Sequence, residues 1–255
     1  MIGLFDSGLG GLSVARALRA LLPEHDLIYL ADSAHCPYGP QPAAAVRARA
    51  EACARWLVDQ GARLVVVACN TATSAGVEQL RATLPVPVVG MEPGVKPAAA
   101  ATRTGRVAVL ATSGTIGGER FARLVERYGS GLNLRTVACP EMVQLVERGE
   151  LAGPRAQAVV DGYVKPLSAE GVDTLVLGCT HFPPLRPLIA MAAPGATIVD
   201  TGPAVAAQAA RLAAREGIGP GAGTLRCATT GDPRAVAAAA AHVWGAPVAM
   251  EAVRQ

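Results

Sequence analysis

Two cysteines of this chain stand in nearly the same local sequence. Cys69 ends a run of valines in "LVVVACNTAT" (64–73), and Cys179 ends a similar run in "TLVLGCTHFP" (174–183). Each is followed by hydroxyl or amide side chains that suit the first turn of a helix, where free N–H groups stabilise a thiolate and attract a carboxylate. One strand-end cysteine alone would be read as an inert core residue. The repetition favours a functional pair.

Two thiols that face each other across a cleft suit the inversion of a carbon that carries a hydrogen. One group removes the proton from one face, and the other delivers a proton to the opposite face. For the reverse direction the roles exchange, so two like groups from two similar halves of a molecule meet the requirement. Because an unperturbed thiol has a pKa near ~8.5, modest tuning leaves one thiolate and one thiol near neutral pH.

Polar residues near the two cysteines are candidate helpers. Asp6, in "FDSGLGG" (5–11), either caps a tight strand-to-helix turn or lies near Cys69, where it would take the thiol proton or orient a substrate amine. Ser7 would then contact the substrate. The glycine spacing of this stretch matches neither a P-loop nor a dinucleotide fingerprint. His181, two residues after Cys179, is a candidate proton partner for that thiol.

Two further segments carry candidate residues. In the loop "ADSAHCPYGPQ" (31–41), Tyr38 and Gly39 would present a hydroxyl and a backbone N–H to a ligand, unless Tyr38 only packs. Cys36 of the same loop has no counterpart in the second half of the chain, which argues against a third active thiol. Glu147, in the charged segment "VERGE", would by itself be read as a solvated side chain.

An alternation of short strands and longer helices must position these residues. Strands are predicted at 2–5, 27–31, 64–68, 86–89, 106–111, 133–138, 174–178, 197–199 and 224–228. Helices are predicted at 10–21, 42–60, 73–83, 94–102, 117–128, 140–147, 153–170, 184–192, 203–215 and 233–244. Such alternation is typical of βαβ units, and it predicts an α/β fold with mainly parallel sheets flanked by helices.

An internal similarity divides the chain into two halves. "IGLFDSGLGG" (2–11) resembles "VAVLATSGTIGG" (107–118), just as the segment around Cys69 resembles the one around Cys179. We therefore expect two pseudo-symmetric α/β domains, one formed by 1–95 plus 205–255 and the other by 96–204. Ligands of open parallel sheets bind beyond the carboxyl ends of the strands, so the active site should lie in the cleft between the domains.

Composition excludes several classes of protein. Hydrophobic residues make up 51% of the chain and charged residues 17%, which excludes a disordered chain. A net charge of +3 without an arginine–aromatic cluster predicts no nucleic-acid partner, and no apolar run is long enough for a membrane span. Six singly spaced cysteines without a CxxC pair argue against disulfides and a thiolate metal site. No signal peptide is visible, so we expect a cytoplasmic protein.

Six motifs, in this order and spacing, carry a family resemblance. They are "FDSGLGGLSV", "CPYGP", "ACNTAT", "VACPEMVQLVERGE", "LGCTHFPPLRP" and "VDTGPAVA". Together they resemble the bacterial glutamate racemases, of the cofactor-independent aspartate/glutamate racemase family. The resemblance implies interconversion of L- and D-glutamate without cofactor or metal, supply of D-glutamate for peptidoglycan, and commonly a homodimer.

The resemblance also implies roles for single residues. Cys69 and Cys179 match the catalytic acid/base pair, with Cys69 acting on D-glutamate and Cys179 on L-glutamate. Asp6 and His181 match the residues that assist each cysteine, and Glu147 matches a further acidic residue near the second. The implied substrate contacts are Asp6, Ser7, Tyr38, Gly39, Asn70, Thr71, Thr112, Ser113, Thr115, Thr180 and His181.

Three alternatives stay open on the sequence. A pyridoxal-phosphate racemase needs a Schiff-base lysine, and only Lys96 and Lys165 are present, each directly before a proline. An aspartate or hydantoin racemase of the same family differs in pocket length, which the sequence does not reveal. A non-catalytic two-lobed amino-acid-binding protein would bind glutamate without touching its α-hydrogen.

Overall fold

Two parallel sheets organise the chain, of which a computed structural model describes residues 1–253. The first sheet has the strand order β10-β9-β2-β1-β3-β4 and the second the order β6-β5-β7-β8. Every strand pairing within the described residues is parallel. The predicted fold class, an α/β fold with parallel sheets flanked by helices, is thus confirmed.

The strands of the first sheet come from both ends of the chain. They are β1 (Ile2–Asp6), β2 (Leu27–Ala31), β3 (Val65–Val67), β4 (Val88–Val89), β9 (Leu225–Thr229) and β10 (Met250–Ala252). The second sheet holds β5 (Arg106–Ala111), β6 (Asn133–Ala138), β7 (Thr174–Gly178) and β8 (Thr197–Asp200). The central strands β1, β2, β3 and β7 are buried along their whole length, whereas the edge strands β6 and β8 are partly exposed.

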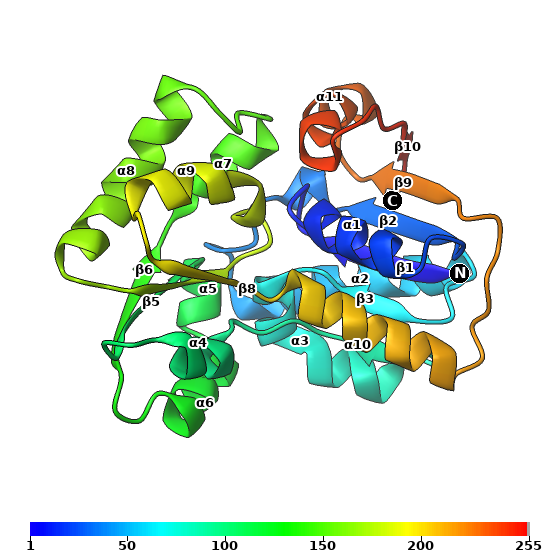
Figure 1. Cartoon of the computed structure of the whole chain (residues 1–255). Helices are drawn as coiled ribbons and strands as arrows, with labels where there is room; N and C mark the ends of the chain where they lie inside the picture. Colours follow the sequence, from blue (N-terminus) through cyan, green and yellow to red (C-terminus); the bar gives the residue numbers. More distant parts are fainter. Residues whose placement is uncertain (254–255) are drawn as a thin grey trace.

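Helices flank each sheet. Around the first lie α1 (Leu12–Leu21), α2 (Ala43–Asp59), α3 (Asn70–Thr83), α10 (Gly202–Arg215) and α11 (Pro233–Trp244). Around the second lie α4 (Val95–Ala101), α5 (Ser113–Ile116), α6 (Glu119–Tyr128), α7 (Pro140–Glu147), α8 (Pro154–Ala169) and α9 (Arg186–Ala192). Two short 3₁₀ segments are η1 (Ser33–His35) and η2 (Pro183–Leu185). Figure 1 shows the two sheet-and-helix groups side by side.

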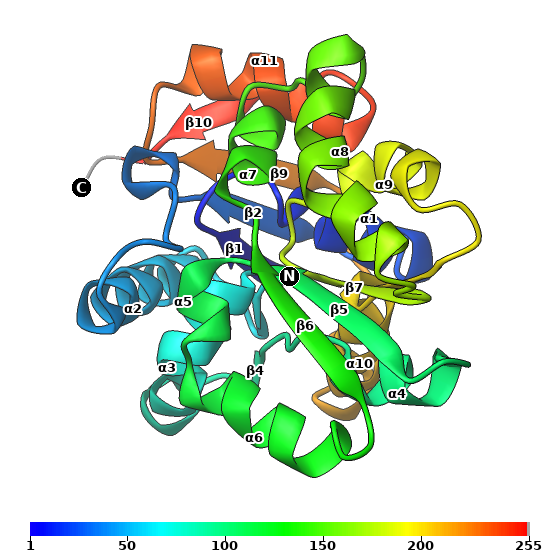
Figure 2. The same ribbon diagram turned by 90° about the vertical axis from the view of Figure 1, so that its left-hand side faces the viewer.

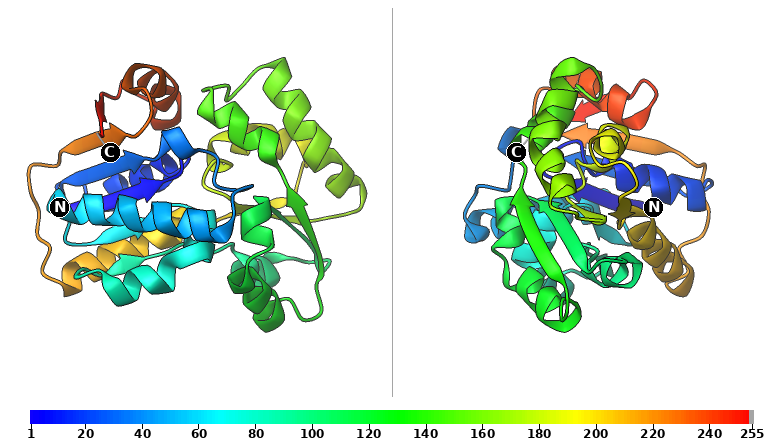
Figure 3. Two further views of the ribbon diagram at one scale, coloured as in Figure 1. Left: turned by 180° about the vertical axis from the view of Figure 1, so that it is seen from behind. Right: turned by 60° about the vertical axis from the view of Figure 1, so that its left-hand side comes forward.

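The two groups exchange chain segments. After β8 the chain crosses back, and α10 packs against α1 of the first group. Figure 2 looks onto the second group, with β5 and β6 in front and α7 and α8 above α4 and α6. The two views in Figure 3 show the orange and red C-terminal elements returning to the blue N-terminal sheet. The predicted domain boundaries, 1–95 plus 205–255 and 96–204, stay a prediction that this arrangement supports.

Local chemistry explains where the last helix begins and ends. The side chain of Asp232 accepts a hydrogen bond from the backbone N–H of Arg234 at 3.1 Å, and Pro233 occupies the first helical position. Gly245 then ends α11 with φ at 89°, a left-handed conformation that glycine adopts without strain. Both signals are visible in the sequence, and the predicted bounds 233–244 agree with the structure.

The structure departs from the sequence prediction at several elements. Strand β10 was not predicted, because its three residues at a sheet edge carry no clear apolar alternation. The helix predicted at 117–128 is wrong in its start, since Gly117 and Gly118 separate α5 from α6. The helix predicted at 184–192 begins as the 3₁₀ segment η2 before α9. Among residues 1–253 no helix is long and apolar enough to cross a membrane.

Candidate active site

One small buried pocket lies where the carboxyl ends of strands from both sheets meet. Cys69 follows β3 of the first sheet, and Cys179 follows β7 of the second. The lining residues are Ser7, Pro37, Tyr38, Gly39, Cys69, Asn70, Thr71, Thr112, Val143, Cys179, Thr180 and His181. We call this the two-cysteine pocket. Its volume is about 10 Å³, which is on the order of the space that a single water needs.

Cys69 lies at the N-terminus of α3, as the sequence predicts. It is the N-cap residue, and its Sγ accepts a hydrogen bond from the backbone N–H of Ala72 at 3.5 Å. The residue is 4% exposed. Burial, together with the carboxylate of Asp6, raises the pKa of the Cys69 thiol well above its ordinary value, although the Ala72 N–H opposes this rise. Cys69 is therefore held as a thiol, ready to donate a proton.

Asp6 combines the two readings that the sequence left open. One carboxylate oxygen, Oδ1, accepts from the N–H of Ser7 at 2.7 Å, and Oδ2 accepts from the N–H of Gly11 at 2.7 Å. Oδ2 also accepts a hydrogen bond, at 3.2 Å, from the hydroxyl of Thr180, a residue of the other sheet group. Asp6 thus closes the turn after β1 and at the same time lies beside Cys69.

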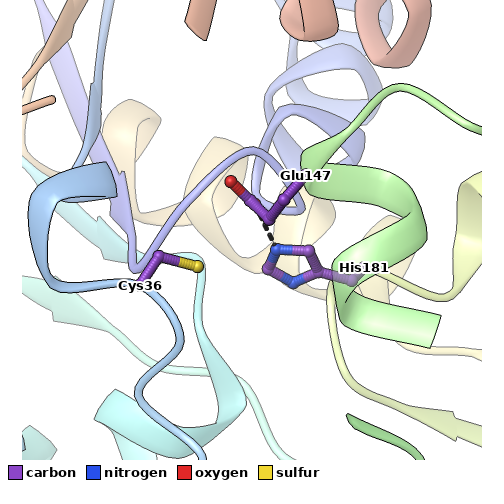
Figure 4. A group of neighbouring side chains, drawn as sticks. All are labelled: Cys36, Glu147 and His181. Carbon is purple, nitrogen blue, oxygen red and sulfur yellow. Dashed lines mark hydrogen bonds and ion pairs between the residues drawn. The ribbon is translucent and has the colours of Figure 1, made fainter. Parts of the chain in front are cut away.

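Cys179 has a histidine–carboxylate pair behind it. His181 Nδ1 lies 3.7 Å from Cys179 Sγ, and His181 Nε2 lies 2.6 Å from Glu147 Oε1, as Figure 4 shows for the second contact. Burial would lower the pKa of His181, but its neighbours Cys179, Cys36 and Glu147 outweigh burial and raise it well above its ordinary value. The His181 ring therefore lies between the Cys179 sulfur and the Glu147 carboxylate, which makes it a candidate proton partner for that cysteine.

Glycines of the "GLGG" turn let this pair approach the backbone. A Cβ atom on Gly8 would overlap the Glu147 carboxylate, and a Cβ atom on Gly10 would overlap the His181 ring. The backbone N–H of Leu9 donates to Glu147 Oε1 at 2.6 Å. The turn after β1 therefore leaves room for two side chains of the second sheet group, Glu147 and His181. In the sequence these glycines invite comparison with phosphate and dinucleotide loops and with a tight turn. This close approach was missed because Glu147 and His181 lie far away in the sequence.

A chain of hydroxyl groups joins the two sheet groups on the other side of the pocket. Thr71 Oγ1 lies 2.8 Å from Thr112 Oγ1, which lies 3.0 Å from Thr115 Oγ1. The Ser113 hydroxyl donates to the carbonyl of Gly39 at 2.9 Å. Thr71, Thr112 and Gly39 line the pocket, whereas Ser113 and Thr115 do not. These contacts must loosen before the pocket can admit a molecule larger than water.

The loop 31–41 is organised by a residue that the sequence analysis did not single out. Asp32 is 0% exposed, and it accepts hydrogen bonds from the Tyr38 hydroxyl, from Arg49 at 2.8 and 3.0 Å, and from Thr230 at 2.8 Å. Burial would raise the pKa of Asp32, but these donors hold it below the ordinary value. A carboxylate directly after the buried strand β2 was the signal that could have identified it.

The turn after Cys179 differs from the helix start expected there. The Phe182 N–H donates to the Cys179 carbonyl at 3.1 Å, η2 follows, and α9 begins only at Arg186. Pro183 and Pro184 have no N–H to donate, so this segment cannot present the row of free donors that α3 presents. The two cysteines are alike in position but have different electrostatic partners, namely a helix N-terminus with Asp6 and a histidine.

Neither lysine lies at the two-cysteine pocket. Lys96 lies over the ring of Tyr128, with its Nζ 5.7 Å from the ring centre. Lys165 forms an exposed ion pair with Asp161 at 2.8 Å. A Schiff-base mechanism at this pocket would therefore have no lysine to use.

Comparison with known proteins gives one consistent answer. A family model described as Asp/Glu/Hydantoin racemase matches residues 12–209. The chain is 47% identical over 250 residues to the glutamate racemase of Pseudomonas aeruginosa, covering 96% of this chain and 94% of the relative. It is 48% identical over 238 residues to the glutamate racemase of Roseiflexus sp., covering 91% and 88%.

Solved structures agree with the sequence relatives. Glutamate racemase isoform RacE1 from Bacillus anthracis superposes with a TM-score of 0.87 at 29% identity, covering 100% of this chain and 97% of the other. Escherichia coli glutamate racemase, in complex with L-glutamate and the activator UDP-MurNAc-ala, gives 0.85 at 31% identity, covering 99% and 98%. On the fold, the two cysteines and these matches together, the chain belongs to the Asp/Glu/hydantoin racemase family.

Proposed function

We propose that this chain interconverts L- and D-glutamate, with Cys69 and Cys179 as the two acid/base groups. The observation that supports this most is that two thiols from two different sheets line one buried pocket. Inversion of a carbon needs groups on both of its faces, and two separate sheet groups can supply them. The choice of glutamate rests on relatives of 47% and 48% identity that are named glutamate racemases.

From L-glutamate, Cys179 acts as the base. Its thiolate takes the α-proton, and the Cys69 thiol delivers its proton to the opposite face. This leaves D-glutamate, a Cys179 thiol and a Cys69 thiolate. From D-glutamate the same steps run in reverse. We propose that Asp6 assists Cys69 and that Glu147 keeps His181 charged.

The carbanionic transition state needs stabilisation, because an α-proton beside a carboxylate is far less acidic than a thiol. Backbone N–H groups in the first turn of α3 and the hydroxyls of Thr71 and Thr180 are among the donors around the pocket. The small closed volume keeps bulk water away from these groups. The proposed substrate contacts remain those of the resemblance: Asp6, Ser7, Tyr38, Gly39, Asn70, Thr71, Thr112, Ser113, Thr115, Thr180 and His181.

The cellular setting follows from the product. D-glutamate is a building block of peptidoglycan, so we propose a role in cell-wall biogenesis and cell shape. Six cysteines without a disulfide among the described residues suit a reducing compartment, and we propose a cytoplasmic location. We also propose a homodimer, because family members commonly form one, and sedimentation at several concentrations tests it.

Exchange in heavy water tests the proposal directly. L-glutamate is incubated with the protein in D₂O, and the α-proton signal and the circular dichroism are followed together. Both signals should decay without any added cofactor. Persistence of the α-proton with tight glutamate binding would instead identify an amino-acid-binding protein. Faster exchange of L-aspartate or of a hydantoin than of glutamate would contradict the substrate assignment.

A further inference from the structure

A third thiol lies beside the His181–Glu147 pair. Cys36 belongs to the loop after η1, Glu147 ends α7, and His181 follows β7, so the three side chains come from three separate segments. One ligand atom from each lies within 4.8 Å of those of the other two. Figure 4 shows the Cys36 sulfur directed toward the imidazole ring and the carboxylate. The proposed reaction assigns Cys36 no part.

This set of donors is the one that Zn²⁺ prefers. A thiolate, an imidazole and a carboxylate bind zinc at roughly 2.0–2.3 Å and commonly leave a fourth position for water. Tetrahedral geometry at those lengths places donor atoms roughly 3.3–3.6 Å apart. Donor atoms at the 4.8 Å limit of this cluster must therefore approach by about 1.2–1.5 Å, and His181 Nε2 and Glu147 Oε1, which are 2.6 Å apart, must separate by about 0.7–1.0 Å. Cys36 is partly exposed and lies outside any helix or strand, so its side chain is less restricted than one in the core.

We propose that Cys36, Glu147 and His181 form a site for Zn²⁺ whose occupation inhibits the enzyme. On binding, the Cys36 thiol and His181 Nε2 each release a proton to solvent, and the metal replaces the Nε2 proton as the partner of the Glu147 carboxylate. No electron is transferred. The inhibitory effect rests on the proposed function, whereas the metal site itself does not.

Metal binding would disable His181 without filling the two-cysteine pocket. A metal-bound imidazole keeps its Nδ1 proton, and losing it would create an imidazolate. His181 could then no longer take up or release a proton when Cys179 changes between thiol and thiolate. The site also ties a loop of the first sheet group to two segments of the second, which opposes the widening that glutamate entry requires. We therefore expect inhibition that a chelator reverses and that high glutamate relieves in part, because metal binding and glutamate entry oppose each other.

Direct metal binding is the first test, because it needs no catalytic activity. Co²⁺ is titrated into the reduced, metal-free protein, and the near-ultraviolet band of sulfur-to-cobalt charge transfer is recorded. Cys36→Ala should weaken Co²⁺ binding by about a hundredfold and remove the band. Cys36→Ser keeps the size of the side chain and should behave alike if Cys36→Ala proves unstable. Cys227→Ala, a buried thiol of β9, is the matched control and should bind as the parent protein does.

Thermal unfolding and activity give the second and third readouts. Zn²⁺ should raise the melting temperature of the parent protein and of Cys227→Ala, but not that of Cys36→Ala. With each rate taken relative to the variant's own metal-free rate, Cys36→Ala should need about a hundredfold more Zn²⁺ for half inhibition. An unchanged cobalt band or an unchanged Zn²⁺ sensitivity in Cys36→Ala would overturn the proposal, since the metal would then sit on the catalytic thiols. Absence of binding to the parent protein would overturn it as well.

Discussion

Glu147→Gln tests whether a negative charge behind His181 contributes to catalysis. Glu147 Oε1 accepts two hydrogen bonds, from His181 Nε2 at 2.6 Å and from the Leu9 N–H at 2.6 Å. Because Leu9 can only donate, the glutamine must place its oxygen where the carboxylate oxygen was. The substitution thus keeps both hydrogen bonds and the geometry, and removes only the charge.

The expected magnitude follows from the hydrogen bond to His181. A charge-assisted hydrogen bond is worth roughly 1.5–3 kcal/mol and a neutral one roughly 0.5–1.5 kcal/mol, so the difference between the midpoints is about 1.2 kcal/mol. A loss of about 1.2 kcal/mol in the transition state lowers kcat/KM about eightfold. Since Glu147 is one of the groups that raise the pKa of His181, that pKa should fall, and the alkaline limb of the pH profile should move to lower pH.

Glu147→Ala is the comparison that separates charge from position. It leaves the Leu9 N–H and the His181 ring without this acceptor, so a larger loss of activity, about a hundredfold, and a lower unfolding free energy are expected. Initial rates from circular dichroism across pH, with denaturant melts of each variant, supply the data. Parent-like kcat/KM and an unmoved alkaline limb in Glu147→Gln would refute the reasoning, because the carboxylate charge would then do nothing for His181.

Three further predictions concern other parts of the molecule. Cys69→Ala and Cys179→Ala should each abolish racemisation in the optical assay, and near-normal turnover in either would contradict the two-thiol mechanism. Tyr38→Phe removes one donor from a buried carboxylate and should raise KM for glutamate more than it lowers kcat, in steady-state kinetics. Asp173 accepts four hydrogen bonds, at 2.6, 2.7, 2.8 and 2.9 Å; burial would raise its pKa, but these bonds hold it well below the ordinary value. A carboxylate with a lowered pKa stabilises the fold at pH values above its unfolded pKa, and this stabilisation is lost as the pH falls through its folded pKa. Asp173→Asn should therefore lower the unfolding free energy by about 1–3 kcal/mol at neutral pH and by less in acid, as measured in denaturant melts.

Local sequence signals predicted the part of the site that lies on regular elements. The valine run before Cys69 is a buried strand, and Asn70 and Thr71 open the helix that follows. A helix start is a local event, decided by the side chains of one turn, so a single stretch of sequence contains the information. The same reasoning failed after Cys179, where two adjacent prolines remove the donors of the first turn.

Contacts between distant segments could not be predicted in this way. Glu147 ends a helix whose sequence suggests a solvated face, yet its carboxylate lies against Leu9 and His181. Asp32 gathers donors from Tyr38 and Thr230, which lie in different parts of the chain. The absence of a CxxC pair argues only against metal ligands on one local turn. Donor groups gathered from three segments, such as Cys36, Glu147 and His181, leave no such pattern in the sequence.

The two cysteines have different neighbouring groups, but the equilibrium between the enantiomers limits how differently a mutation can affect the two directions of the reaction. L- and D-glutamate have equal free energies in water, so the equilibrium mixture contains equal amounts of both, and kcat/KM must be equal in the two directions for every variant. Asp6 beside one thiol and His181 beside the other can therefore make the two directions differ only in how kcat/KM divides between kcat and KM. A loss at Glu147 should appear equally in kcat/KM from both enantiomers, although kcat alone is free to differ. Unequal losses in kcat/KM would mean that the measured reaction includes a step other than racemisation.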